Sequence, residues 1–108
     1  MVTGKEVAQK LLEFYDSSSK WTKGWYAKDI NAGLDTALSK DAVCWCALGA
    51  IRKIYIQPSD GSAYAKALAL SIQTAFPDQE WEGVDEWNDG FSSFDEFRNA
   101  LQRVAEAG

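Results

Sequence analysis

The sequence predicts an all-α fold: a single compact domain over residues 1–108, with about four helices and two aromatic-rich loops. At two places a Ser or Thr is followed three residues later by Glu, the capping-box pattern that starts a helix. After each of them apolar residues recur at steps of three and four, which is typical of one buried helix face. A chain of 108 residues can form a core without disulfides or metal ions, so we expect one domain.

The two capping boxes predict where the first and last helices begin. Thr3 and Glu6 start the first helix, which we expect to end near Ser17. Its apolar stripe consists of Val7, Ala8, Leu11, Leu12 and Tyr15. Ser93 and Glu96 start the last helix, in which the same spacing is kept by Phe94, Phe97, Leu101 and Val104.

Residues 20–38 read as a long irregular loop that carries Trp21 and Trp25. Gly24 and Gly33 within it suggest positive φ angles or a close approach of the backbone. A loop of this length is uncommon in a compact domain. We therefore expect it to be either functional or held in place by its tryptophans.

A second helix is expected from near Ser39 to about Ile56. Residues 43–51 are apolar nearly all round, which predicts the most buried element of the fold. A short buried strand is the competing interpretation, because periodicity cannot separate the two over so short a run. Gly49 lowers helix propensity, so we expect another backbone or a Trp ring to approach it closely.

A third helix is expected over residues 62–76, and Pro77 ends it. Residues 78–91 then form an acidic loop that carries Trp81 and Trp87. Trp45 lies in the apolar run and should pack in the core. Because Trp81 and Trp87 lie among carboxylates, core packing and partner binding remain equally open for them.

Charge is unevenly distributed along the chain. The formal net charge of −5 divides into +2 for residues 1–56 and −7 for residues 57–108. This acidic balance argues against direct binding to nucleic acid or to an anionic membrane, because phosphate contacts need clustered cations. It favours a partner with a basic surface.

The chain has no histidine, which excludes Ser-His-Asp and Cys-His catalysis and histidine-ligated metals. Phosphate-binding glycine loops, a Gly-x-Ser-x-Gly elbow and a Cys-x-x-Cys pair are also missing from the sequence. The acidic segment fails the EF-hand pattern, so a solvated acidic surface is the better interpretation than a metal site. We expect no cofactor and no metal, and the missing catalytic motifs favour a non-enzymatic protein over an enzyme.

The two cysteines point to a reducing compartment. Cys44 and Cys46 are separated by one residue, and in a helix they would face nearly opposite sides and could not pair. The N-terminal residues have no signal-peptide core, and the apolar run of residues 43–51 is too short to cross a bilayer. We therefore expect a soluble, cytoplasmic protein with reduced thiols.

Three segments together carry a resemblance to a known family. They are Trp21 with residues 24–29 (Gly-Trp-Tyr-Ala-Lys-Asp), residues 44–51 (Cys-Trp-Cys-Ala-Leu-Gly-Ala-Ile) and residues 87–89 (Trp-Asn-Asp). The chain resembles an uncharacterised family of small bacterial and phage proteins. That family has a Gly-Trp loop, a Trp-Cys-x-Leu-Gly-Ala helix and a Trp-Asn-Asp step. The resemblance implies a compact domain and a bacterial or phage setting, but no activity.

The leading functional hypothesis is a small non-enzymatic protein that binds another protein whose surface is basic. Its predicted contact residues, aromatic anchors and steering acids, are Trp81, Glu82, Asp85, Glu86 and Trp87. One alternative is a phage-encoded inhibitor whose acidic face occupies a host protein's nucleic-acid site. Another is an enzyme or small-ligand binder that uses carboxylates such as Asp29 and Asp89 near the Trp-bearing loops. A deep pocket that holds two or more convergent carboxylates with raised pKa values would favour the last of these, and a closed, Trp-filled core would count against it. The sequence does not predict the oligomeric state.

Overall fold

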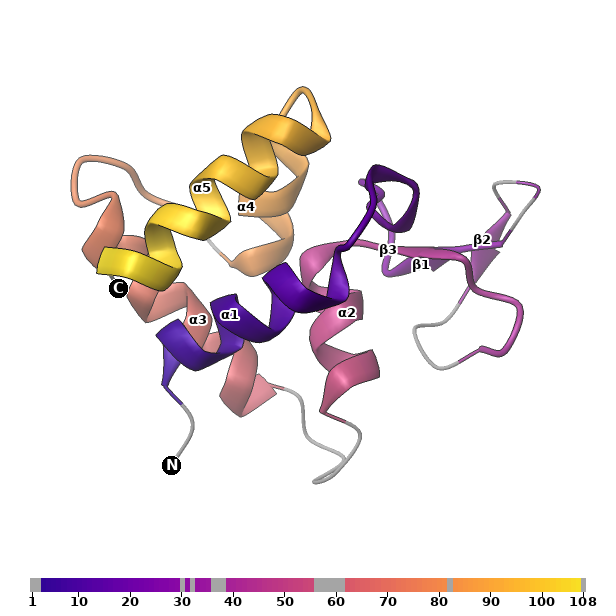
Figure 1. The fold of residues 1–108 in the computed structure, drawn as a ribbon, viewed down its shortest axis with the longest axis horizontal. Coiled ribbons are helices and arrows are strands. Elements are labelled where there is room, and N and C mark those ends of the chain that lie inside the picture. The colour runs from indigo at the N-terminus through magenta and orange to yellow at the C-terminus, as the bar shows by residue number, and fades with distance from the viewer. Residues whose placement is uncertain are drawn as a thin grey trace.

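Five α-helices and a small β-sheet form the part of the chain that the computed structural model describes, residues 3–29, 31, 33–35, 39–55, 62–81 and 83–107. The helices gather around α1, and the sheet lies at one end of the molecule (Figure 1). The helices are α1 (Gly4–Phe14), α2 (Ala47–Ile54), α3 (Ser62–Ala75), α4 (Val84–Asp89) and α5 (Phe94–Ala107). A 3-10 turn, η1 (Ser18–Lys20), follows α1. The strands are β1 (Ala27–Lys28), β2 (Leu34–Asp35) and β3 (Cys44–Trp45).

The predicted helix ends are largely confirmed. Thr3 Oγ1 accepts a hydrogen bond from the Glu6 amide at 3.2 Å, and Ser93 Oγ accepts one from the Glu96 amide at 3.2 Å. The Glu96 carboxylate accepts from the amide of Ser92 rather than of Ser93 (3.0 Å), so the second box is shifted by one residue. Helix α3 ends at Ala75, before Pro77, as predicted.

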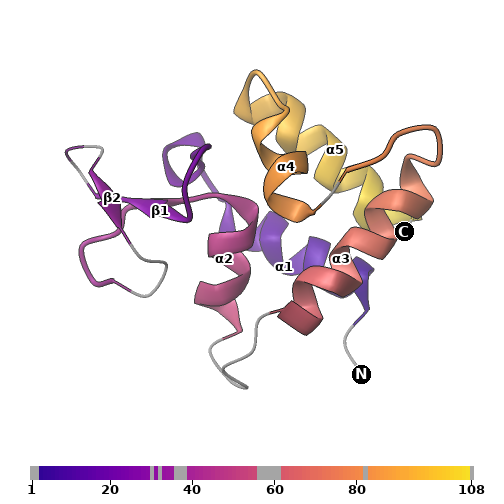
Figure 2. The same cartoon turned by 180° about the vertical axis from the view of Figure 1, so that it is seen from behind.

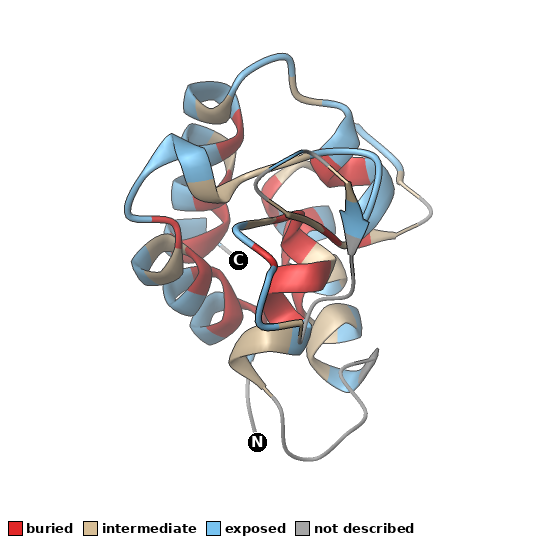
Figure 3. Ribbon diagram, turned by 90° about the vertical axis from the view of Figure 1, so that its right-hand side faces the viewer, coloured by how far each residue is buried: buried red, intermediate tan, exposed pale blue. Residues whose placement is uncertain are grey.

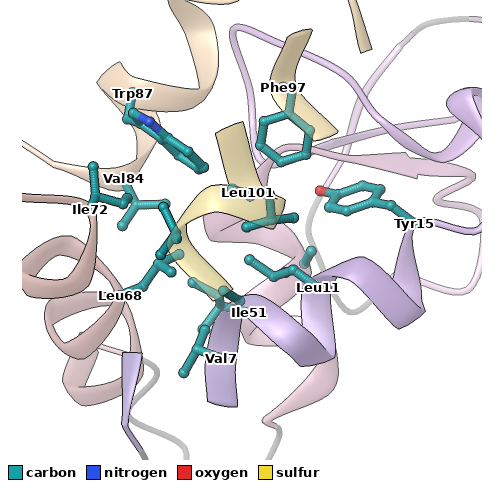
Figure 4. Packing of buried hydrophobic residues seen from close by; sticks show 14 of the residues in the cluster. Val7, Leu11, Tyr15, Ile51, Leu68, Ile72, Val84, Trp87, Phe97 and Leu101 are labelled. Atoms are coloured by element: carbon teal, nitrogen blue, oxygen red, sulfur yellow. The ribbon is translucent and has the colours of Figure 1, made fainter. Parts of the chain in front are cut away.

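The core is built around α1, which packs against α3 and α5. Buried residues line the inner sides of the helices, and exposed residues cover their outer sides (Figure 3). Phe97 is fully buried and contacts several rings, with centroid distances of 5.4 Å to Tyr15, 5.2 Å to Trp21 and 5.4 Å to Trp87. Figure 4 shows Tyr15, Trp87 and Phe97 together with Leu11 and Leu101.

The sheet corrects the all-α prediction: the fold is mostly helical, with three short strands in the order β2-β1-β3. Both pairs are antiparallel, and Ala27 lies opposite Trp45. The Trp45 carbonyl accepts hydrogen bonds from the Tyr15 hydroxyl at 2.7 Å and the Thr22 amide at 3.1 Å. The sheet is thereby joined to the end of α1 and to the segment after η1.

Two predicted boundaries change as a result. The helix expected from Ser39 begins only at Ala47, because Cys44 and Trp45 pair with β1 and Cys46 is the N-cap, its sulfur accepting from the Gly49 amide at 3.4 Å. Both interpretations of the run at 43–51 are therefore partly right, a strand followed by a helix. The predicted loop at 20–38 contains β1 and β2. The predicted acidic loop at 78–91 contains α4, which packs on α2 and α3 (Figure 2).

Gly49 allows a close approach of α2 to the sheet. A Cβ atom at this position would overlap the carbonyl oxygen of Tyr26, just before β1. The expected close backbone contact at Gly49 is confirmed. It fixes the segment that bears Trp25 and Tyr26 against α2.

Candidate functional site

The side-chain amide of Asn88 connects three distant segments. Asn88 is fully buried on α4, and its Oδ1 accepts hydrogen bonds from the Trp21 indole N–H at 2.7 Å and the Ala47 amide at 2.9 Å. Its Nδ2 donates to the Thr22 carbonyl at 3.0 Å and to Asp89 Oδ1 at 3.1 Å. Both donors and both acceptor positions of the amide are thus used. Asn88 holds α4, the start of α2 and the segment after η1 in one arrangement.

Asp89 and Gly24 extend this connection to the surface. Gly24 has a φ of +84°, a conformation that favours glycine, and its amide donates to Asp89 Oδ1 at 3.0 Å. Lys23, beside it, donates to the Phe91 carbonyl at 2.8 Å. The next residues, Trp25 and Tyr26, are consequently presented beside the exposed side of α4.

A pocket of about 220 Å³ lies between this segment and α4. Trp25 is 45% exposed, the highest exposure among the described tryptophans. Tyr26 is half-buried, and the guanidinium of Arg52 lies 4.4 Å from the centre of its ring. The residues that line the pocket are Gly24, Trp25, Tyr26, Cys46, Asp85 and Asp89.

Two of the lining residues are carboxylates from one helix. Asp85 and Asp89 are four residues apart in α4, so their side chains lie on the same helix face. Lys10–Glu13 and Asp16–Lys20 form ion pairs in the described part of the chain, and neither pair includes Asp85 or Asp89. Like charges at this spacing repel each other. Two carboxylates without an ion-pair partner among the described residues therefore lie in the pocket next to an exposed indole.

Cys46 lines the same pocket with a neutral thiol. Burial is the main cause that raises the pKa of this thiol, and the nearby carboxylates of Asp89 and Asp85 raise it further. The backbone N–H groups of Gly49 and Leu48 act in the opposite direction. Both Cys46 and the half-buried Cys44 are free thiols in the structure. Unpaired cysteines were expected. However, the expectation assumed that both lie in a helix, whereas Cys44 belongs to β3 and Cys46 is the N-cap of α2.

The predicted contact residues divide between core and surface. Trp87 is 1% exposed and packs against Phe91 at 5.3 Å and Phe97, so it cannot serve as a surface anchor and that prediction is corrected. Trp81 is half-buried, with its ring 6.0 Å from that of Phe76. Asp85 and Glu86 are exposed on α4, whereas Glu82 lies outside the described residues.

The sequence interpretation missed the aromatic wall of the pocket. Trp25 and Tyr26 were assigned only to a long loop, and the one pattern that could have identified them was the neighbouring Gly24. Asp89, named for the small-ligand alternative, does line the pocket. Asp29 does not, because its Oδ1 accepts from the amides of Asn31 and Gly33 at 2.9 Å each and stabilises the turn before β2.

The described residues do not form a set of metal ligands. No three His, Cys, Asp or Glu side chains of residues 3–29, 31, 33–35, 39–55, 62–81 and 83–107 come together as metal ligands would. The pocket offers two carboxylates, a buried thiol and two rings. This set is suited to an organic cation, because carboxylates supply charge and aromatic faces attract cations.

The fold and the pocket define a compact, mostly helical domain, and no helix in the described part of the chain has the length and apolar run needed to cross a membrane. The chain belongs to a family of unknown function (DUF6197), whose model matches residues 7–107. No curated protein and no solved structure matches the chain. The Trp-bearing segments 21–29, 44–51 and 87–89 meet around Asn88, where hydrogen bonds connect Trp21, Gly24, Ala47 and Asp89.

Proposed function

We propose that this domain is a non-enzymatic binding protein of bacterial or phage origin, acting in the cytoplasm on a protein partner with a basic surface. The observation that carries the proposal is a stretch of exposed acidic residues on and around α4. Residues 78–96 include no Lys or Arg. Among the described residues of this stretch the exposed acids are Asp78, Glu80, Asp85, Glu86, Asp89, Asp95 and Glu96.

A surface of one charge sign attracts a partner of the opposite sign and raises the rate of encounter. Trp81, Asp85 and Glu86 are the contact residues that we propose on this surface, together with Glu82. Trp87 supports them from inside, since its ring holds α4 on the core. This division agrees with the usual anatomy of binding surfaces, in which charged residues surround a few anchoring side chains.

The proposal is tested with oligolysine as a model of a basic surface and oligoglutamate as the matched negative control. Fluorescence anisotropy at increasing salt should show binding to oligolysine that weakens as salt screens the charges. The double variant Glu80→Lys/Glu86→Lys should weaken this binding by about tenfold or more. Neither residue lines the pocket.

The matched control is Glu13→Lys/Glu106→Lys, which changes the net charge equally at exposed positions outside the acidic stretch. It should reduce affinity far less than the first pair. If both double variants lost the same affinity for oligolysine, net charge alone would explain the binding, and a localised binding surface would be contradicted. If DNA then competes with the domain for a captured basic protein, the inhibitor alternative is supported.

A further inference from the structure

We propose that the pocket between α4 and residues 24–26 binds one primary alkylammonium group, as carried by a lysine side chain. This inference rests on the proposed function, because it assigns the part of the partner that the acidic surface would bind most specifically. The argument uses the charge, the rings, the size and the rigidity of the pocket.

The charge of the pocket favours a cation. Asp89 Oδ1 accepts from Gly24 and Asn88, and its second oxygen accepts no hydrogen bond from the described residues. Asp85 accepts no hydrogen bond from the described part of the chain, and neither carboxylate has a Lys or Arg partner there. An ammonium group offers three N–H donors and a compact charge, which can be shared between two carboxylates one helical turn apart.

The rings of the pocket favour an organic cation over a metal ion. Trp25 is nearly half exposed at the pocket's edge, and indole is the best aromatic partner for an ammonium ion. Tyr26 already carries the guanidinium of Arg52 on its ring. Trp25 is therefore the lining ring left for a ligand. Carboxylates alone would suit Ca²⁺ as well, but that ion needs at least six oxygen ligands.

The size of the pocket suits a side chain. Its volume of about 220 Å³ is below the roughly 300–1,000 Å³ of sites for drug-sized ligands. An apolar cavity of about 150 Å³ is sufficient for benzene. A lysine side chain, with four methylene groups and one ammonium, is of this order. The neutral Cys46 thiol gives its methylene groups a weakly polar surface to contact.

The pocket is held in its open shape before any ligand binds. The amide of Asn88 fixes Thr22 and Asp89, and the Gly24 amide fixes the other side of the same carboxylate. A prearranged site loses less entropy on binding. Most basic side chains on the partner's surface would lie against the acidic stretch of residues 78–96, and one lysine side chain would enter the pocket.

The test is an NMR titration of the full chain with Nα-acetyl-lysine methylamide, followed by the Trp25 indole and Gly24 amide resonances. Nα-acetyl-norleucine methylamide is the uncharged control, and the arginine analogue and n-butylamine are titrated in parallel. We expect the lysine derivative to shift both resonances and the norleucine derivative to shift neither. Shifts of equal size with norleucine, or tighter binding of the arginine analogue, would overturn the proposal.

Variants separate the contributions. Trp25→Ala should weaken binding about three- to tenfold, and Asp85→Asn by tenfold or more, whereas the control Asp78→Asn, outside the pocket, should change it less than twofold. If all three variants bind equally, the assignment is wrong. Butylamine binding as tightly as the lysine derivative supports the ammonium site and assigns it to free amines rather than to a protein.

The two proposals fail in different ways. If oligolysine binds with the expected salt dependence while the lysine derivative leaves Trp25 and Gly24 unshifted, the acidic surface stands and the pocket assignment is overturned. If the lysine derivative binds in the pocket while oligolysine does not bind, the pocket stands and the protein partner is wrong.

Discussion

The two sides of α4 differ in burial and in bonding, although their residues are adjacent in one short helix. On the inner side, Trp87 and Asn88 are buried, and Asn88 makes four hydrogen bonds to residues of other segments and to its neighbour. On the outer side, Asp85 and Asp89 line a pocket and carry no ion pair within the described residues. The inner side is built for stability, and the outer side keeps its charges available.

The largest change in stability is expected on the inner side of α4, from Asn88→Leu. The substitution keeps the side-chain size but removes the acceptor of the Trp21 indole and the Ala47 amide, which are then left without a partner. We expect a loss of about 3 kcal/mol in the free energy of unfolding, measured by urea denaturation. Asn99→Leu, at an exposed position of α5, is the control. A loss no larger than that of the control would mean that the Asn88 amide does not organise the fold.

Gly49→Ala should have the next largest effect, about 2 kcal/mol of destabilisation. Its Cβ would overlap the backbone oxygen of Tyr26, which outweighs the roughly 1 kcal/mol gain in helix propensity. Gly90→Ala is the matched control, because a Cβ there meets its nearest neighbours at 3.5 Å and φ is −77°. If both glycines tolerate alanine equally in thermal unfolding, the close contact at Gly49 is not essential.

Alkaline pH tests two buried ionisable groups outside α4, the hydroxyl of Tyr15 and the thiol of Cys46, of which the thiol also lines the pocket. Burial raises the pKa of the Tyr15 hydroxyl and the Cys46 thiol above their ordinary values of 10.0 and 9.0. The unfolded chain therefore releases these protons first, so stability is complete below about pH 9 and falls as pH rises further. The slope should approach about 1.4 kcal/mol per pH unit for each group that titrates only when unfolded. Cys46→Ala should reduce the earliest part of this fall, whereas an unchanged profile would contradict the burial of the thiol. Near neutral pH the curve should be flat, since the chain has no histidine.

The smallest effect on stability is expected on the outer side, from Asp85→Asn. Removing one of two like charges four residues apart should leave the free energy of unfolding unchanged or raise it by a few tenths of a kcal/mol. A clear loss of stability in thermal unfolding would show that Asp85 has a structural partner. It would then no longer be a free charge of the pocket.

Local sequence patterns were sufficient to predict the helices with strong end signals. Thr3, Ser93 and Pro77 mark helix ends through contacts within a few residues, and the structure agrees with each of them. Strands β1 and β2 were missed, and β3 was only the competing interpretation of residues 43–51. Each strand has two residues, too few for an alternating pattern, and the pairing of β1 with β3 joins residues far apart in the chain. The burial of Trp87 could not be separated from partner binding for a related reason. Its neighbours in sequence are acidic, but Phe97 and Phe91 cover its ring.

The pocket could be predicted only in part. Asp85 and Asp89 were recognised as candidates from the acidic composition of their segment. Their partner residues Trp25 and Tyr26 are about sixty positions away, and tertiary contacts such as the hydrogen bonds of Asn88, Gly24 and Lys23 bring them together. No spacing rule within the sequence reports such a contact.

The most direct test of the division between the two sides of α4 measures lysine binding and unfolding free energy on the same variants. Trp25→Ala and Asp85→Asn should lose affinity for Nα-acetyl-lysine methylamide while the free energy of unfolding stays within about 0.5 kcal/mol of the unmodified chain. A parallel loss of affinity and stability in these two variants would contradict the account. It would mean that the pocket residues hold the fold together rather than bind a cation.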